Sequence, residues 1–100
     1  MKAIWNNTII AEAPKEVLIR IEGNWYFPPD ALKREYFQED SHHTHCPWKG
    51  DASYFNIVVN GETNESGAWY YPTPKDGSIE RVKKDFTNYV AFWNGIEVIE

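Results

Sequence analysis

Ser53-Tyr54-Phe55-Asn56-Ile57-Val58-Val59, followed directly by Asn60-Gly61, is the stretch of sequence that decides the fold. Aromatic and β-branched residues dominate it, which favours an extended strand. Alternate side chains of a strand face opposite ways, so Phe55, Ile57 and Val59 share one face while Tyr54 and Val58 help to cover the other. Asn-Gly is a favoured two-residue hairpin turn. We therefore expect a central strand over residues 53–59 and a return strand over residues 68–71, after a polar excursion.

The rest of the chain repeats this pattern of short apolar runs separated by turn residues. Hairpins are expected over residues 5–11 and 17–27, and the clearest one over residues 89–99, where Asn94-Gly95 fits a type I′ turn. Residues 30–37 are the one predicted helix, and residues 79–85 are expected to form a helical turn or to stay irregular. The sum is an all-β, mainly antiparallel fold in which coiled sheets form a small barrel or a folded sandwich, with one short helix.

Composition limits the classes of function. The chain has 100 residues, 42% of them hydrophobic and 16% aromatic, as expected of one globular β-domain spanning residues 1–100. Its net charge of −5 disfavours nucleic-acid binding, because an acidic surface repels the phosphate backbone. No membrane span or signal peptide is visible. A single cysteine allows no internal disulfide and predicts a cytoplasmic location.

The stretch Thr44-His45-Cys46-Pro47-Trp48-Lys49-Gly50 gathers the chemically capable residues, and we expect it to be a loop that feeds the central strand. Cys46 is a candidate nucleophile and His45 a candidate acid or base, but the pattern favours burial of an inert Cys46. Lys49 would bind an anion as a point charge, and we expect it to be exposed together with Trp48. Gly50 would supply a positive-φ turn into the strand.

A histidine cluster precedes that turn: His42-His43-Thr44-His45-Cys46. Imidazole and thiolate are natural ligands of zinc. On an extended segment, however, His43 and His45 share a face while Cys46 points elsewhere, and a closed zinc site needs four ligands. No metal site and no cofactor are therefore predicted, and zinc is the metal that the cluster would suit.

A small-ligand cleft is the functional site that the sequence favours. Trp48, Tyr54 and Trp69 would form its aromatic walls, and Lys49 and His45 would be its convergent polar groups. The alternative is that these aromatic residues only fill the core.

Several blocks along nearly the whole chain resemble the domain-of-unknown-function 427 family of small bacterial proteins. They are Trp25-Tyr26-Phe27-Pro28-Pro29-Asp30, Ser41 through Thr44 to Cys46-Pro47-Trp48-Lys49-Gly50, Ala52-Ser53-Tyr54, Ala68-Trp69-Tyr70-Tyr71-Pro72 and Tyr89-Val90-Ala91-Phe92. The most specific block is Cys-Pro-x-Lys-Gly, followed four residues on by Tyr54.

The resemblance implies coiled antiparallel sheets, Mss4-like in outline, and no established activity. Some classifications label the family nucleotidyltransferase-like. That chemistry uses a Gly-Ser turn for phosphate and acidic residues for Mg²⁺, but the only Gly-Ser here is Gly77-Ser78, and no Asp-x-Asp follows it. Cys-x-x-Cys pairs, which bind zinc in Mss4-like proteins, are absent from this sequence, so the resemblance transfers no metal site.

Together these features predict a small domain that binds an anionic or aromatic small molecule near the Cys-Pro-Trp-Lys-Gly turn. Two alternatives stay open. One is an enzyme that uses Cys46 or His45, with nucleotidyl transfer as the variant that the family label suggests. The other is an interaction module that offers an edge strand to a partner protein.

Overall fold

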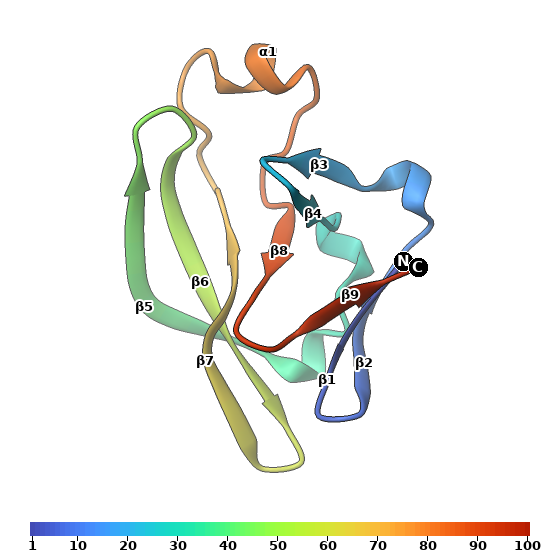
Figure 1. Ribbon diagram of the computed structural model, residues 1–100. Coiled ribbons are helices and arrows are strands. Elements are labelled where there is room, and N and C mark those ends of the chain that lie inside the picture. The colour runs from blue at the N-terminus through green and yellow to red at the C-terminus, as the bar shows by residue number, and fades with distance from the viewer.

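Antiparallel strands make up most of the structure, a computed structural model that describes residues 1–100 (Figure 1). A three-stranded sheet has the order β2 (Thr8–Glu12), β1 (Lys2–Trp5) and β9 (Glu97–Ile99). A second sheet contains only β3 (Ile19–Ile21) and β4 (Asn24–Tyr26). The mainly antiparallel β prediction is therefore confirmed.

The largest sheet carries the candidate site. It has four strands in sequence order: β5 (Phe37–Cys46), β6 (Gly50–Val59), β7 (Glu62–Tyr70) and β8 (Val90–Phe92). β5 is an edge strand and is solvent-exposed along most of its length. β6 lies inside the sheet and contains the predicted central strand.

Two predicted turns, Asn6-Asn7 and Asn60-Gly61, are confirmed by backbone geometry, and the turn expected at Gly23-Asn24 lies one residue earlier. Asn6 and Asn7 have φ values of 51° and 59°, and they join β1 to β2. Glu22-Gly23 joins β3 to β4, and Asn60-Gly61 joins β6 to β7, all with positive φ. The return strand was predicted too short, because β7 begins at Glu62 directly after the turn. Its polar residues pair with β6 rather than forming an excursion.

The expected hairpin over residues 89–99 is wrong, although its turn exists. Asn94 and Gly95 have φ values of 54° and 86°, and the Ile96 N–H donates to the Trp93 carbonyl at 3.1 Å. The flanking strands then separate, because β8 pairs with β7 and β9 pairs with β1. Each strand gains more by completing a larger sheet than by forming an isolated two-stranded ribbon.

The helix predicted over residues 30–37 is also wrong. Two 3₁₀ turns, Pro29–Ala31 and Arg34–Tyr36, occupy this segment, and β5 begins at Phe37. Extended residues between the turns bridge to β2, where the Lys33 N–H donates to the Ile10 carbonyl at 2.9 Å. The backbone of this segment therefore hydrogen-bonds to a neighbouring strand instead of forming the hydrogen bonds of a helix. The one α-helix is instead α1 (Ser78–Val82).

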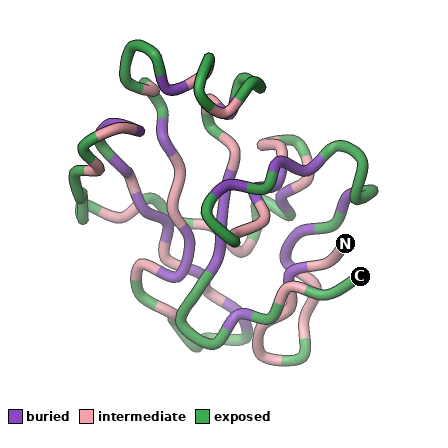
Figure 2. The backbone as a smooth tube through the Cα atoms, turned by 45° about the horizontal axis from the view of Figure 1, so that its top comes forward, coloured by how far each residue is buried: buried purple, intermediate pink, exposed green.

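The strands do not close into the predicted small barrel, because the hydrogen-bonded pairs form three separate sheets. Two clusters of buried side chains lie between them, and Figure 2 shows that the buried segments run through the interior while the turns are exposed. The larger cluster includes Phe27, Ile57 and Phe92, and the smaller includes Tyr26, Tyr71 and Phe86. No helix is long and apolar enough to cross a membrane.

Candidate functional site

The loop expected over residues 44–50 is shorter than predicted, because the strand that carries the histidine cluster continues into it. β5 continues to Cys46, and a three-residue turn over residues 47–49 leads into β6. The register places His45 opposite Asp51 and His43 opposite Ser53. Side chains of directly paired residues lie on the same face of a sheet. His43 and His45 therefore share a face, as predicted.

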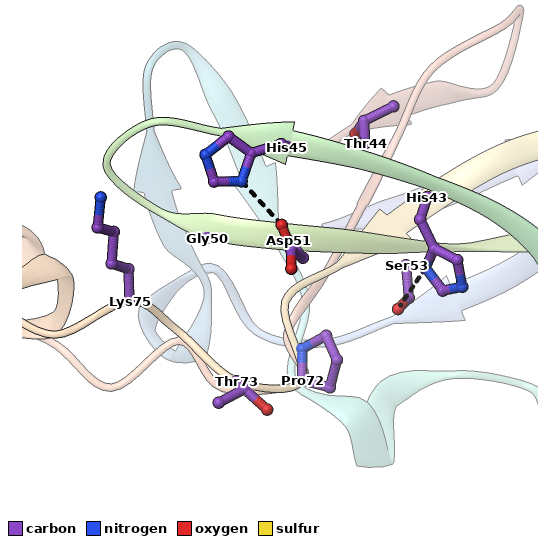
Figure 3. A pocket seen from close by; sticks show the side chains of 9 residues that line it. All are labelled: His43, Thr44, His45, Gly50, Asp51, Ser53, Pro72, Thr73 and Lys75. Carbon is purple, nitrogen blue, oxygen red and sulfur yellow. Dashed lines mark hydrogen bonds and ion pairs between the residues drawn. The ribbon is translucent and has the colours of Figure 1, made fainter.

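A polar groove of about 830 Å³ lies along this face (Figure 3). One side is the β5–β6 hairpin, and the other is the segment 72–75, where the Lys75 N–H donates to the Lys49 carbonyl at 2.8 Å. Its polar lining consists of His43, Thr44, His45, Asp51, Ser53, Thr73 and Lys75. Gly50 and Pro72 are the other two lining residues. The groove therefore suits a polar ligand rather than an apolar one.

Two cross-strand pairs orient the imidazoles of the groove (Figure 3). His45 Nδ1 lies 2.8 Å from Asp51 Oδ1, and His43 Nδ1 lies 3.3 Å from Ser53 Oγ. A carboxylate can only accept, so His45 Nδ1 carries a proton. Both rings use Nδ1 within the protein, which leaves Nε2 for a ligand. The Lys75 ammonium donates to the Pro47 carbonyl at 2.8 Å and keeps two further N–H groups.

Lys49 is not the exposed residue that the sequence predicted. Only 6% of it is accessible, and it faces the smaller core cluster, away from the groove. Its Nζ donates to Glu22 Oε1 at 2.5 Å and lies 5.4 Å and 5.3 Å from the ring centres of Trp48 and Tyr71. A carboxylate and two aromatic faces thus stabilise the buried ammonium.

The electrostatics around buried Lys49 and its exposed partner Glu22 favour a charged lysine. Burial alone would lower the pKa of Lys49, but the hydrogen bond to Glu22 and the interactions with Tyr26 and Tyr71 raise it above its usual value. The hydrogen bond from Lys49 in turn lowers the pKa of Glu22. Burial raises the pKa of Tyr26, and it raises that of Tyr71 to about 12. A lysine held in its ammonium form is a poor nucleophile.

The predicted aromatic walls do not converge on the groove. Trp69 Nε1 donates to the Tyr26 hydroxyl at 3.0 Å, and the Tyr54 hydroxyl lies 3.0 Å from Thr44 Oγ1. Trp48 lies against Arg81, whose guanidinium is 4.3 Å from the ring centre. Of the predicted ligand-binding residues, only His45 lines the groove.

Cys46 lies at the end of β5, next to His45, so the two side chains point to opposite faces. It is partly buried and packs against the smaller core cluster, so the expected burial is found only in part. The structure therefore does not pair the thiol with the His45 imidazole. In addition, no group of three or more His, Cys, Asp or Glu side chains is placed to hold a metal ion.

Sequence reasoning missed Asp51, Ser53, Thr73 and Lys75. The first two follow from the register once the turn is known to occupy residues 47–49, because β5 and β6 then pair outward from Cys46 and Gly50. No local signal identifies Thr73 and Lys75. They reach the groove through the hydrogen bond between residues 75 and 49, which are distant in sequence.

Comparison with protein families matches residues 1–99 to NTP_transf_9, the domain of unknown function DUF427. The chain belongs to this family. A comparison with curated proteins gives no match.

The Gly77-Ser78 pair of this DUF427 domain is not built as a phosphate site. Ser78 is 2% exposed, and its hydroxyl donates to the Lys75 carbonyl at 2.6 Å. The serine is therefore used to fix the turn before α1. The Cys46–Gly50 block, by contrast, forms the turn from which both the groove and the ion pair between buried Lys49 and Glu22 are built.

Proposed function

We propose that this protein binds a small anionic molecule in the polar groove between the β5–β6 hairpin and the segment 72–75. The observation that carries the proposal is the placement of Lys75, two oriented imidazoles and the hydroxyls of Ser53 and Thr73 around one polar depression. Ammonium, imidazolium and hydroxyl groups all donate hydrogen bonds to phosphate or carboxylate oxygens. The one carboxylate of the lining, Asp51, is already engaged by His45.

Inorganic phosphate is the simplest probe. Titrated into the ¹⁵N-labelled protein, it should shift the amide signals of residues 43–45, 51–53 and 73–75 together. We expect Lys75→Gln to weaken binding about tenfold, the equivalent of one charge-assisted hydrogen bond. His45→Gln should weaken it less, because the glutamine keeps a hydrogen-bonding group.

Matched controls are available on the same elements. His42→Gln changes a histidine of β5 that does not line the groove, and Lys84→Gln removes an exposed lysine elsewhere. Both should leave phosphate binding unchanged. Equal affinities for wild type, Lys75→Gln and His45→Gln would show that any phosphate effect arises outside the groove.

Catalysis in the same groove is a second candidate, favoured by the His45–Asp51 pair. A carboxylate that fixes the tautomer of a histidine is the usual support of a general acid or base. We expect any hydrolysis of aryl phosphates or esters by the purified protein to fall at least about 100-fold in His45→Gln. The same rate in the variant would assign the hydrolysis to a contaminant and remove this candidate.

A further inference from the structure

A second depression of about 410 Å³ lies where the four-stranded sheet meets the 3₁₀ turns that precede β5. Its base is apolar and its rim is charged. Its lining includes Phe37, Phe55, Tyr70, Val90, Arg34 and Glu39. It differs from the polar groove in offering aromatic surface, and we call it the aromatic pocket.

The rings in the aromatic pocket are held by one another. Phe55 and Tyr70 stack with centroids 4.6 Å apart and an interplanar angle of 22°. Phe37 meets Phe55 edge to face at 5.4 Å. Phe55 is 7% exposed, whereas Tyr70 and Phe37 are only partly buried. A planar ligand thus meets a preformed aromatic surface and orders little of the protein on binding.

The strand register places the aromatic pocket next to the polar groove on one face of the sheet. His43 pairs with Ser53, Ser53 with Tyr70, and Tyr70 with Val90, so these four residues form one row across the sheet. Directly paired side chains share a face. The row begins in the groove at His43 and ends in the pocket at Val90.

The next two rows extend this surface in both directions. Asp51 lies on the groove side of Ser53, and Phe55 lies on the pocket side, each two residues away along β6. Residues two apart on a strand are separated by about 7 Å. His45 lies in the same row as Asp51. A ligand with its ring beside Phe55 and its negative charge near Ser53 or His45 must therefore span roughly 7–13 Å.

The lining of the aromatic pocket also includes charged side chains. Arg34 and Glu39 line the aromatic pocket, and neither forms an ion pair within the protein. The Arg34 guanidinium donates to the Pro29 carbonyl at 3.1 Å and retains other donors. Arg34 in the pocket and Lys75 in the groove place a cation at each end of the surface, next to the carboxylates of Glu39 and Asp51 respectively.

We propose that the groove and the aromatic pocket are one binding surface, and that its ligand is a small aromatic anion. This inference rests on the proposed function, since the groove must hold the anionic group. The stacked rings of Phe55 and Tyr70 take the planar part of the ligand. Ser53 lies at the junction, within reach of both parts.

The test compares three probes by calorimetry: 2-naphthyl phosphate, inorganic phosphate and 2-naphthol. We expect the joined probe to bind at least about tenfold more tightly than either fragment, because its second group binds at a high effective concentration. Phe55→Leu should weaken 2-naphthyl phosphate about fivefold, as expected for one lost stacking partner, and should leave phosphate unchanged. Lys75→Gln should weaken both.

Phe92→Leu is the matched control. Phe92 is 6% exposed, lies in the same row as Phe55 through Ala68, and does not line the pocket. Phe92→Leu should lower the free energy of unfolding about as much as Phe55→Leu does, without changing the affinity for 2-naphthyl phosphate. If Phe55→Leu does not fold, Tyr70→Leu removes the partly exposed member of the same stack.

The outcomes separate the two proposals. Weakening of 2-naphthyl phosphate by Lys75→Gln but not by Phe55→Leu overturns the shared surface and keeps the anion groove. Weakening by Phe55→Leu alone overturns the groove as an anion site, and the combined surface with it. Equal affinities for 2-naphthol and 2-naphthyl phosphate would also overturn the groove as an anion site, and the combined surface with it.

Discussion

Glu22→Gln should lower the free energy of unfolding by about 2 kcal/mol, because it leaves the buried Lys49 ammonium without its carboxylate. The Lys49 side chain is 8% exposed, and Glu22 Oε1 is its ion-pair partner at 2.5 Å. Breaking a fully buried pair costs roughly 3–5 kcal/mol. We expect less here, since the Glu22 side chain is 54% exposed and solvent screens the interaction.

Urea unfolding of a double-mutant cycle measures this interaction. Lys49→Met should cost less than Glu22→Gln, because it leaves a carboxylate that water can reach, and the double variant should recover at least about 1 kcal/mol. Glu16→Gln, at an exposed glutamate without an ion pair, is the control and should change little. A coupling energy near zero would mean that the aromatic rings alone stabilise the ammonium.

The pair also fixes the direction of a pH effect. The hydrogen bond from Lys49 lowers the pKa of Glu22 below its ordinary 4.5. A carboxyl with a lowered pKa contributes its stability fully above the unfolded value and loses it as the pH falls through the folded value. The stability difference between wild type and Glu22→Gln should therefore be constant from pH 7 to about 5.5 and shrink toward pH 3. Asp40 and Asp85 also have lowered pKa values, and taking the difference cancels their contributions.

The sequence predicted those parts of the fold that depend on neighbouring residues. Asn6-Asn7 and Asn60-Gly61 each place residues that tolerate positive φ between two strands, and Gly23 marks the third turn to within one residue. Each of these turns joins two strands that pair with each other. Local turn chemistry was sufficient in these cases.

The failures arose where a distant partner decided the outcome. The residues around Asn94-Gly95 carry the same local signal, yet β8 and β9 find their partners in β7 and β1. The segment 30–37 has a plausible helical pattern, but its backbone pairs with Ile10. Neither competing partner is visible in a local window of sequence.

In the candidate site, too, features set by neighbouring residues were predicted and features set by distant partners were not. Alternation along β5 correctly placed His43 and His45 on one face. Lys49 was expected to be exposed, because burying a lysine is costly without a partner. The partner, Glu22, lies 27 residues away in the turn between β3 and β4, so the sequence around Lys49 could not reveal it.

These placements give the two faces of the β5–β6 hairpin different roles. On the inner face, the Lys49–Glu22 pair fastens the hairpin to the β3–β4 turn and leaves no charge free for a ligand. On the outer face, His45 and its neighbours stay accessible to solvent. A ligand-binding surface that is separate from the stabilising ion pair can be mutated without unfolding the protein, which makes the proposed function testable.

Gly50→Ala should be among the most damaging single substitutions, costing on the order of 3 kcal/mol. Gly50 has φ of 112°, which L side chains rarely adopt, and an added Cβ would lie 3.2 Å from both the Lys75 nitrogen and the Thr73 oxygen. The backbone strain and the close approach add, since neither can be relieved without moving the segment 72–75. That segment carries Thr73 and Lys75, so the variant should also lose its response to phosphate.

Gly61→Ala is the matched control, because Gly61 has φ of 78° but nothing within 4 Å of an added Cβ. It experiences the left-handed strain without the contact, and we expect a cost of about 1 kcal/mol with unchanged phosphate binding. Urea unfolding of both variants, with phosphate titration of each, separates strain from contact. If the two substitutions cost the same and both keep phosphate binding, the packing of Gly50 against residues 73–75 does not position the groove, and the anion site must be sought elsewhere.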